Sequence, residues 1–121
     1  MKHRHQGRVL GRERNQRNAL IKTLLGSLVL QEHIMTTEAK AKEIKNYIDQ
    51  VVNKAKTARN DAVRRIAMIR ELQRLVPAVA TKKLLGDFSV RFEGRTSGYT
   101  RVVKLEQRKS DGAKMAIIEF V

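Results

Sequence analysis

Apolar residues between positions 15 and 30 recur every third or fourth residue and predict the first helix. They form two adjacent rows, Leu20, Leu24, Leu28 and Ile21, Leu25, Val29. Together these rows make one broad apolar stripe, which in a water-soluble helix faces a core. Gly26 lies within the same stretch, although Gly costs about 1 kcal/mol relative to Ala inside a helix. We therefore expect another element to pack closely against Gly26.

A second helix is predicted after a short extended segment. Residues 33–36 show no helical period, whereas Thr36 or Thr37 can cap a helix whose first turn contains Glu38. Glu38 and Lys42 are spaced to form an ion pair on its outer face. The residues that repeat at three or four, and should be buried, are Ala41, Ile44, Ile48, Val51, Val52 and Ala55.

Two further helices are predicted on either side of Pro77. Asn60 and Asp61 can cap the third helix, and Pro77 interrupts it. Pro77 also suits the first turn of a fourth helix that ends at Gly86. The apolar side of the third helix is expected to contain Ala62, Ile66, Ile69, Leu72 and Val76.

The chain changes character after Gly86. Residues 86–98 are rich in Gly and read as a loop with one helical turn that brings Phe88 and Phe92 together as core anchors. Two β-branched segments, 99–108 and 114–120, predict strands joined by a hairpin turn at Asp111-Gly112. One face of the hairpin should pack on the helices and the other should meet solvent or a partner. A stable sheet needs a third strand, for which residues 33–36 are the donor. Helices followed by strands predict a two-layer α+β domain of about four helices on a small sheet.

The charge of the chain indicates an anionic partner. The 121 residues contain 26 Lys or Arg against 12 Asp or Glu, for a net charge of +14. Solubility of a small domain needs a net charge of only about 2–8, so we expect a polyanion, with nucleic acid the first candidate. The absence of cysteine excludes disulfides, thiolate metal sites and thiol nucleophiles.

The opening residues, MKHRHQGRVLGRERNQR, hold six cations and one acid. Lys22 interrupts the apolar run that follows, no small-residue cleavage site is present, and the run is too short to span a membrane. A secretion signal and a membrane span are therefore not expected, while an organelle transit peptide remains an alternative. We predict an extended basic arm over residues 1–14 and a globular domain over 15–121. Fully extended, the arm could reach on the order of 45 Å. The other interpretation is a solvated, disordered tail.

Arginine dominates two further basic groups, in residues 54–74 and 91–109. Its planar fork binds phosphates and stacks on bases, which favours structured nucleic acid over a membrane surface. Within the second group, Tyr99 follows a Gly-containing loop and precedes Arg101. Tyr99 could pack on the core at the start of a strand or stack on an unpaired base.

Catalytic and metal-binding patterns are missing from the sequence. His3 and His5 could share one side of an extended arm, but no Cys, His or acid cluster completes a coordination shell. No phosphate-binding Gly-rich loop and no nucleophile elbow occurs. We therefore expect no enzyme, cofactor, metal or small-molecule substrate.

Four motifs give the chain a family resemblance. They are MKHR with Gly7, Arg8, Leu10, Arg12 and Arg17; TTEAKAKE at 36–43; GYTRVVK at 98–104; and MAIIEF at 115–120. In this order and spacing the chain resembles the family of the seventeenth protein of the bacterial large ribosomal subunit. The resemblance implies an α+β protein bound to the large-subunit rRNA near the polypeptide exit tunnel, with neighbouring ribosomal proteins and an arm that reaches into the RNA.

Candidate RNA contacts come from these motifs and from the basic groups. The resemblance implies Lys2, His3, Arg4, Gly7, Arg8, Arg12, Arg17, Tyr99, Thr100 and Arg101, and the basic groups add Arg14 and Arg95. The expected location is the cytoplasm, on the ribosome, with an organelle not excluded. The alternatives are a DNA-binding architectural or regulatory protein and a free interaction adaptor.

Overall fold

The computed structural model describes residue 8 and residues 10–121, and its described part is an α+β fold, as predicted. In chain order the elements are α1 (Arg14–Gln31), β1 (His33–Thr37), α2 (Glu38–Asn60), α3 (Arg65–Leu75), α4 (Ala78–Leu85), a 3₁₀ helix (Asp87–Phe92), β2 (Thr100–Gln107) and β3 (Lys114–Phe120). The strands form an antiparallel sheet in the order β1-β3-β2. The extended segment after α1 is therefore the third strand that the hairpin needed.

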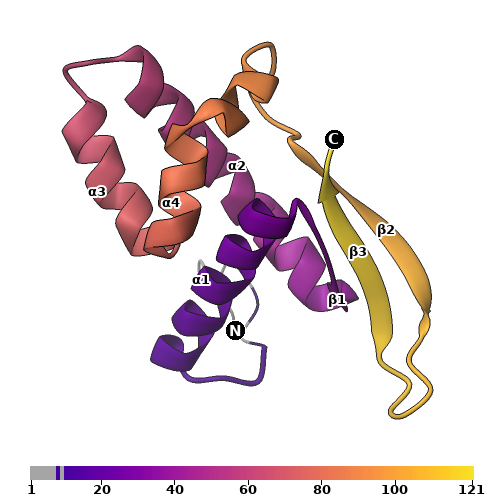
Figure 1. Cartoon of the computed structure of the whole chain (residues 1–121). Coiled ribbons are helices and arrows are strands. Elements are labelled where there is room, and N and C mark those ends of the chain that lie inside the picture. Colours follow the sequence, from indigo (N-terminus) through magenta and orange to yellow (C-terminus); the bar gives the residue numbers. More distant parts are fainter. Residues whose placement is uncertain (1–7, 9) are drawn as a thin grey trace, which may run out of the picture.

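The helices gather on one side of the sheet, and the β2-β3 hairpin extends beyond them (Figure 1). α2 is the central element because it contacts all three strands and also α1, α3 and α4. α1 packs against α4 and β1. This arrangement leaves one face of the sheet covered by helix and the other face open.

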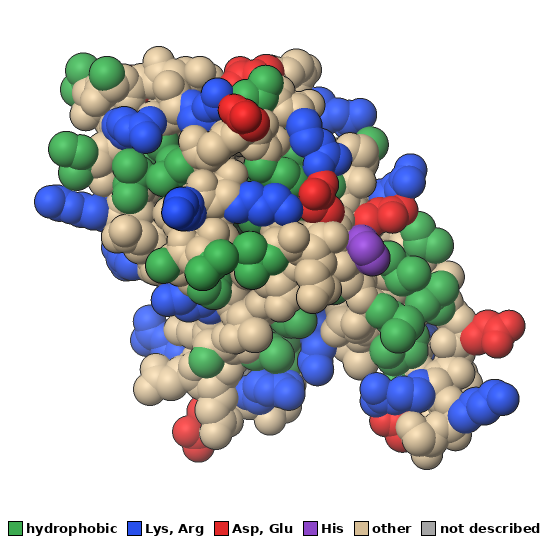
Figure 2. Space-filling model, viewed as in Figure 1, with side chains coloured by type: hydrophobic (Ala, Val, Ile, Leu, Met, Phe, Trp, Pro, Cys, Tyr) green, Lys and Arg blue, Asp and Glu red, His purple; other side chains and the backbone are tan. Residues whose placement is uncertain are grey.

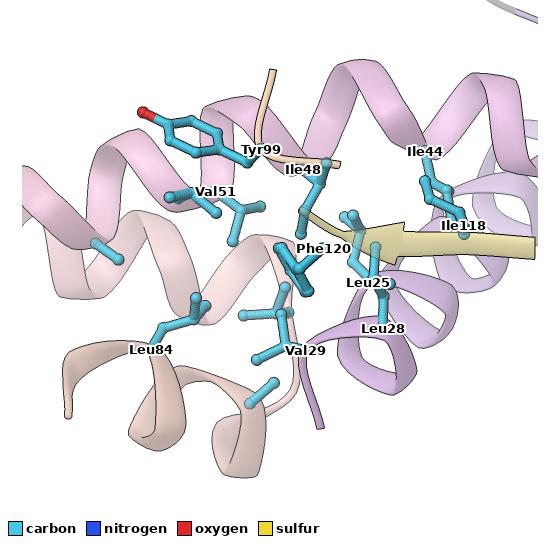
Figure 3. Close-up of a cluster of buried hydrophobic side chains, with 14 of the residues drawn as sticks. Leu25, Leu28, Val29, Ile44, Ile48, Val51, Leu84, Tyr99, Ile118 and Phe120 are labelled. Atoms are coloured by element: carbon cyan, nitrogen blue, oxygen red, sulfur yellow. The ribbon is translucent and has the colours of Figure 1, made fainter. Parts of the chain in front are cut away.

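The core lies between α2, α1, α4 and the inner face of the sheet. Figure 3 shows side chains from these elements converging, among them Leu28 of α1, Ile48 of α2, Leu84 of α4 and Ile118 of β3. An aromatic cluster closes one end: the rings of Phe88 and Phe92 lie 5.5 Å apart, edge to face. Both rings are buried, so their predicted role as core anchors is confirmed.

Local sequence signals place α2 as predicted. The Thr37 side chain accepts a hydrogen bond from the Lys40 backbone N–H at 3.4 Å and caps the helix. Glu38 and Lys42 form the expected ion pair, 2.8 Å between Oε1 and Nζ, and the hydrogen bond from Lys42 lowers the pKa of Glu38. All six residues of the predicted apolar face of α2 are fully buried.

Gly26 sits where α1 meets the start of α4. A Cβ added at Gly26 would lie 2.7 Å from Cδ of Pro77, closer than nonbonded carbons approach. The expected close packing at Gly26 is confirmed, and its partner is the proline that precedes α4.

The start of the third helix differs from the prediction. Asp61 does not cap α3; its Oδ1 accepts hydrogen bonds from the backbone N–H groups of Val63 and Arg64, at 3.0 and 3.3 Å, and holds a turn. Aspartate commonly bonds the backbone two residues on and so favours a turn over a helix. α3 therefore begins only at Arg65. Ala62 is exposed in the turn and Ile66 is 65% exposed, so the predicted apolar face is correct at Leu72 and Val76 and wrong at its first two positions.

The hairpin forms as predicted and its packed face is now defined. Gly112 has a φ of 70°, which glycine adopts without strain. Thr100 is buried and Val102 half-buried on the side that faces α2. Val103 and Leu105 point to the open side and are 44% and 38% exposed.

Candidate nucleic-acid interface

α2 organises the molecule through three stripes of residues that lie roughly a third of a turn apart. One stripe is the buried apolar face. A second consists of Glu43, Tyr47, Gln50 and Lys54 and lines a groove. The third consists of Asp49, Asn53, Lys56 and Asn60 and binds the loop before β2. The two polar stripes therefore serve different purposes.

The groove lies between α1, α2 and α3 and has a volume of about 480 Å³. Its cations are Arg17, Lys22, Lys54 and Arg74, and its apolar floor contains Ile21, Leu25, Tyr47 and Leu75. α1 contributes two of the cations, and α2 and α3 contribute one each. Positive side chains around an apolar floor suit a ligand with charged and planar parts.

The two acids of the groove are both neutralised. Glu43 is buried, and its Oε2 lies 3.3 Å from Nη1 of Arg8. Glu71 lies 2.7 Å from Nζ of Lys54, and the hydrogen bond from Lys54 lowers the pKa of Glu71. Arg17, Lys22 and Arg74 have no ion-pair partner within the part of the chain that the structure describes. Their charge is available to a ligand.

The start of α1 adds positive charge beside this groove. The first turn of α1 includes Arg14 and is followed by Arg17, and the acid Glu13 stands at the N-cap, where it forms a capping box with Gln16. Because Glu13 already places a carboxylate at the positive end of the helix, the charge available beside the groove comes from the side chain of Arg17. Leu10 and Gly11 form a turn with positive φ angles just before the helix, and Arg12 Nη1 donates to the Leu10 carbonyl at 2.7 Å.

The predicted contacts of the arm are only partly described by the structure. Lys2, His3, Arg4 and Gly7 lie outside the described residues, and Arg8, Arg12, Arg14 and Arg17 lie within them. Arg14 stands in the first turn of α1. Arg8 is joined to Glu43 on α2 and lies at the start of that helix with Glu38 and Lys42, outside the lining of the groove. The boundary between arm and domain remains a prediction.

The second predicted group, at the entry to β2, is tied into the fold. Tyr99 is fully buried and packs against Phe92 with ring centroids 5.4 Å apart. Its hydroxyl donates a hydrogen bond to Oδ1 of Asn53 at 2.5 Å. Lys56 donates to the same hydroxyl at 3.2 Å. Of the two alternatives for Tyr99, the structure shows core packing, and the buried ring cannot stack on a base in this conformation.

The neighbours of Tyr99 are also engaged. Thr100 is 4% exposed, and its Oγ1 has no hydrogen-bond partner among the described residues. Arg101 is exposed but pairs with Glu119, 2.7 Å between Nε and Oε1. Arg95 is exposed and donates to the Gly98 carbonyl at 3.4 Å. RNA contact at these positions remains a prediction, and in this conformation Tyr99 exposes neither its side chain nor its backbone, whose N–H and carbonyl are bonded to Asp49 and Val121.

Sequence reasoning did not single out Lys22, Tyr47 or Gln50 as site residues. Lys22 was considered only as an interruption of an apolar run. The spacing of 43, 47, 50 and 54 is itself a signal, because steps of four, three and four place those residues on one side of a helix. What the spacing does not show is that α1 and α3 complete the groove.

Metal-binding clusters and membrane-spanning helices are two further kinds of feature that a fold can contain. Among residues 8 and 10–121, no three His, Asp or Glu side chains lie close enough together to hold a metal ion. In the same part of the chain no helix is both long enough and apolar enough to cross a membrane.

The fold and the groove define a small, strongly basic α+β domain, and the groove cations that have no partner in the described part of the chain suit a polyanion. A family model described as Ribosomal protein L17 matches residues 20–121. The chain is 39% identical over 121 residues to the large ribosomal subunit protein bL17 of Aliarcobacter butzleri, covering all of both chains. It is 39% identical over 123 residues to the protein of that name from Lactococcus lactis subsp. cremoris, covering 94% of this chain and 98% of the relative.

A third relative, the bL17 protein of Sorangium cellulosum, is 35% identical over 143 residues, covering all of this chain and 83% of the relative. The chain belongs to the ribosomal protein L17 family. The family resemblance inferred from the four motifs is confirmed.

Proposed function

We propose that this chain is a structural constituent of the large ribosomal subunit and binds the large-subunit rRNA. The observation that supports RNA binding most directly is the groove, in which Arg17, Lys22 and Arg74 have no ion-pair partner among residues 8 and 10–121. The family relatives are named as proteins of the large ribosomal subunit. The proposal includes a cytoplasmic, ribosome-bound location, contact with neighbouring ribosomal proteins, and a place near the polypeptide exit tunnel. It includes no reaction.

The groove residues divide the work of binding RNA between charge and shape. Arg17 and Arg74 can each offer a planar, two-pronged donor to a phosphate, and Lys22 offers a point charge. The apolar floor at Ile21, Tyr47 and Leu75 suits the less polar sugar and base surfaces. Aromatic side chains in cationic grooves are typical stacking surfaces for unpaired bases.

The basic arm extends this surface in the proposal. Arg8, at the described end of the arm, is held against α2 by Glu43. Lys2, His3, Arg4 and Gly7 are the proposed arm contacts. Phosphate binding by arm and groove together would fix the relative positions of two RNA segments.

Removing the groove cations tests the proposal. The variant Arg17→Gln, Lys22→Gln, Arg74→Gln should weaken binding to a large-subunit rRNA fragment by about 100-fold at about 0.15 M salt. The slope of log K against log salt should become about 2 to 3 units less steep, because each phosphate contact contributes about 0.7–0.9. Both quantities come from one series of fluorescence titrations at increasing salt.

The matched control removes the same charge elsewhere. Arg64, Lys82 and Lys109 are exposed and do not line the groove, so Arg64→Gln, Lys82→Gln, Lys109→Gln lowers the net charge equally. This control should lose less than about tenfold in affinity. Equal losses in the two triple variants would show that only overall charge matters and would reject the groove.

RNA must also be distinguished from DNA, the runner-up ligand. The full chain is titrated against rRNA fragments and duplex DNA of equal length at about 0.15 M salt, where specific complexes stand apart from nonspecific ones. We expect tighter binding to rRNA. Equal affinity would favour a DNA-binding architectural protein.

Sedimentation tests the place of the protein in the cell. In a sucrose gradient of lysate, the chain should sediment with the large ribosomal subunit. Recovery mainly in the light fractions would favour a free adaptor and contradict the proposal.

A further inference from the structure

The open face of the sheet presents a row of apolar side chains across all three strands. Met35 of β1 is opposite Ile117 of β3, which is opposite Val103 of β2. Met35 is 66% exposed and Val103 44%, and Leu105 beside them is 38% exposed. Figure 2 shows hydrophobic side chains gathered over this part of the molecule. We call this set of residues the outer sheet face.

In the next row of outward side chains along the sheet, two opposite charges neutralise each other. Arg101 and Glu119 are directly opposite each other on β2 and β3 and form an ion pair at 2.7 Å. The row therefore offers no net charge to a phosphate, in a protein whose net charge is +14. A polyanion would gain little binding free energy on the outer sheet face. An apolar partner would gain more, because both apolar surfaces would leave water.

We propose that the outer sheet face binds an apolar surface of a neighbouring protein within the same particle, and not RNA. This inference rests on the proposed function, because the particle supplies the partner. It goes beyond that function by assigning the protein-protein contact to one face of the fold, on the open side of the sheet.

The size of the face excludes a second copy of this chain as a stable partner. Three strands about 4.8 Å apart, with three outward residues each, cover roughly 300 Å². Stable interfaces bury about 800 Å² on each partner. The outer sheet face is thus too small to hold two free molecules together, and suits two proteins that bind the same RNA side by side.

Photocrosslinking identifies the occupant. The variant Met35→p-benzoylphenylalanine is expressed in cells, large subunits are purified and irradiated, and the crosslinked species are identified by mass spectrometry. The control is Val63→p-benzoylphenylalanine, because Val63 is 93% exposed in the turn between α2 and α3. We expect position 35 to crosslink to one defined protein of the particle and position 63 not to reach that protein. A crosslink from position 35 to rRNA or to a second copy, or none at all, would overturn the proposal.

A charge placed on the face gives opposite results for the two kinds of partner. Val103→Lys should be released from large subunits at lower salt than the parent chain, because an ammonium group opposes apolar contact. It should bind protein-free rRNA within about twofold of the parent, a change small beside one phosphate contact. Tighter retention, or clearly tighter binding to rRNA, would identify RNA as the occupant and overturn the proposal.

Val63→Lys is the control for added charge. If the proposed function is wrong, the unsubstituted chain will already be absent from purified large subunits. If only this inference is wrong, the unsubstituted chain will be present and the variants will behave differently from the expectation.

Discussion

Two basic segments of this protein, the start of α1 and the entry to β2, look alike in sequence but differ in structure. At α1, Arg14 and Arg17 follow the N-cap residue Glu13, and Arg17 lines a groove whose acids are already paired. At β2, Tyr99 is buried and Arg101 is paired with Glu119. The difference shows that the number of cations in a segment does not measure the charge that a ligand can use. Pairing across the fold determines it.

The largest expected effect comes from Tyr99, because the comparison depends on its burial. Tyr99→Ala should lower the free energy of unfolding by about 3–5 kcal/mol, as loss of a buried aromatic ring usually does. Chemical denaturation measures this change.

Tyr99→Leu separates packing from stacking. Leucine retains part of the buried volume but cannot stack, so the folded variant should bind rRNA within about twofold of the parent, where a lost stack would cost about 1–3 kcal/mol. A clear loss of affinity in that variant would show that the ring of Tyr99 contacts the RNA.

Deleting residues 1–12 is the next largest test and extends the comparison to the arm. The deletion keeps Glu13, the residue before α1, and removes Lys2, Arg4, Arg8 and Arg12. The slope of log K against log salt should flatten by about 2 to 2.7 units if Lys2, Arg4 and Arg12 each meet a phosphate, since Arg8 is already paired with Glu43. An unchanged slope would favour the solvated-tail alternative.

Single substitutions compare Arg17, which has no ion-pair partner among residues 8 and 10–121, with Arg101, which is paired with Glu119. Arg17→Gln should weaken rRNA binding about fivefold at about 0.15 M salt, the value of one phosphate contact. Arg101→Gln should weaken it less than twofold, since Glu119 already holds that guanidinium. Comparable losses would mean that the Arg101–Glu119 pair opens when RNA binds.

The smallest effect is expected at the hairpin turn, where Arg108 is paired with Asp111. The pKa of the Asp111 carboxyl reports on this pair. Hydrogen bonds from Arg108 and the Ala113 backbone lower the pKa of Asp111 to about 2 from an ordinary value of 3.8. Because the folded value is the lower one, this pair stabilises the turn above about pH 4 and the contribution is lost as the pH falls toward 2. An NMR titration of the Asp111 carboxyl should show the low pKa, and Arg108→Gln should return it toward the ordinary value.

Elements governed by neighbours in the chain were predictable. The buried face of α2 follows from helical spacing, its start from the side chain of Thr37, and the hairpin from Asp111-Gly112. The error at Ala62 and Ile66 arose because a side chain that can cap a helix can equally hold a turn, and Asp61 does the second.

The candidate site was less predictable because its parts come together only in the folded chain. Its cations were visible as basic residues, but Lys22 and Arg74 are 52 positions apart and line the groove together only because α1 and α3 both flank α2. The choice between core packing and stacking for Tyr99 likewise depended on Asn53, on another element.

The family, the order of elements and the excess of positive charge follow from the amino-acid sequence alone, because each depends on local spacing, motifs or composition. Packing in three dimensions selects which cations remain available. The pairs Arg8–Glu43 and Lys54–Glu71 join residues 35 and 17 positions apart. Such pairs are set by how helices and strands lie against one another, and no local pattern in the sequence specifies that.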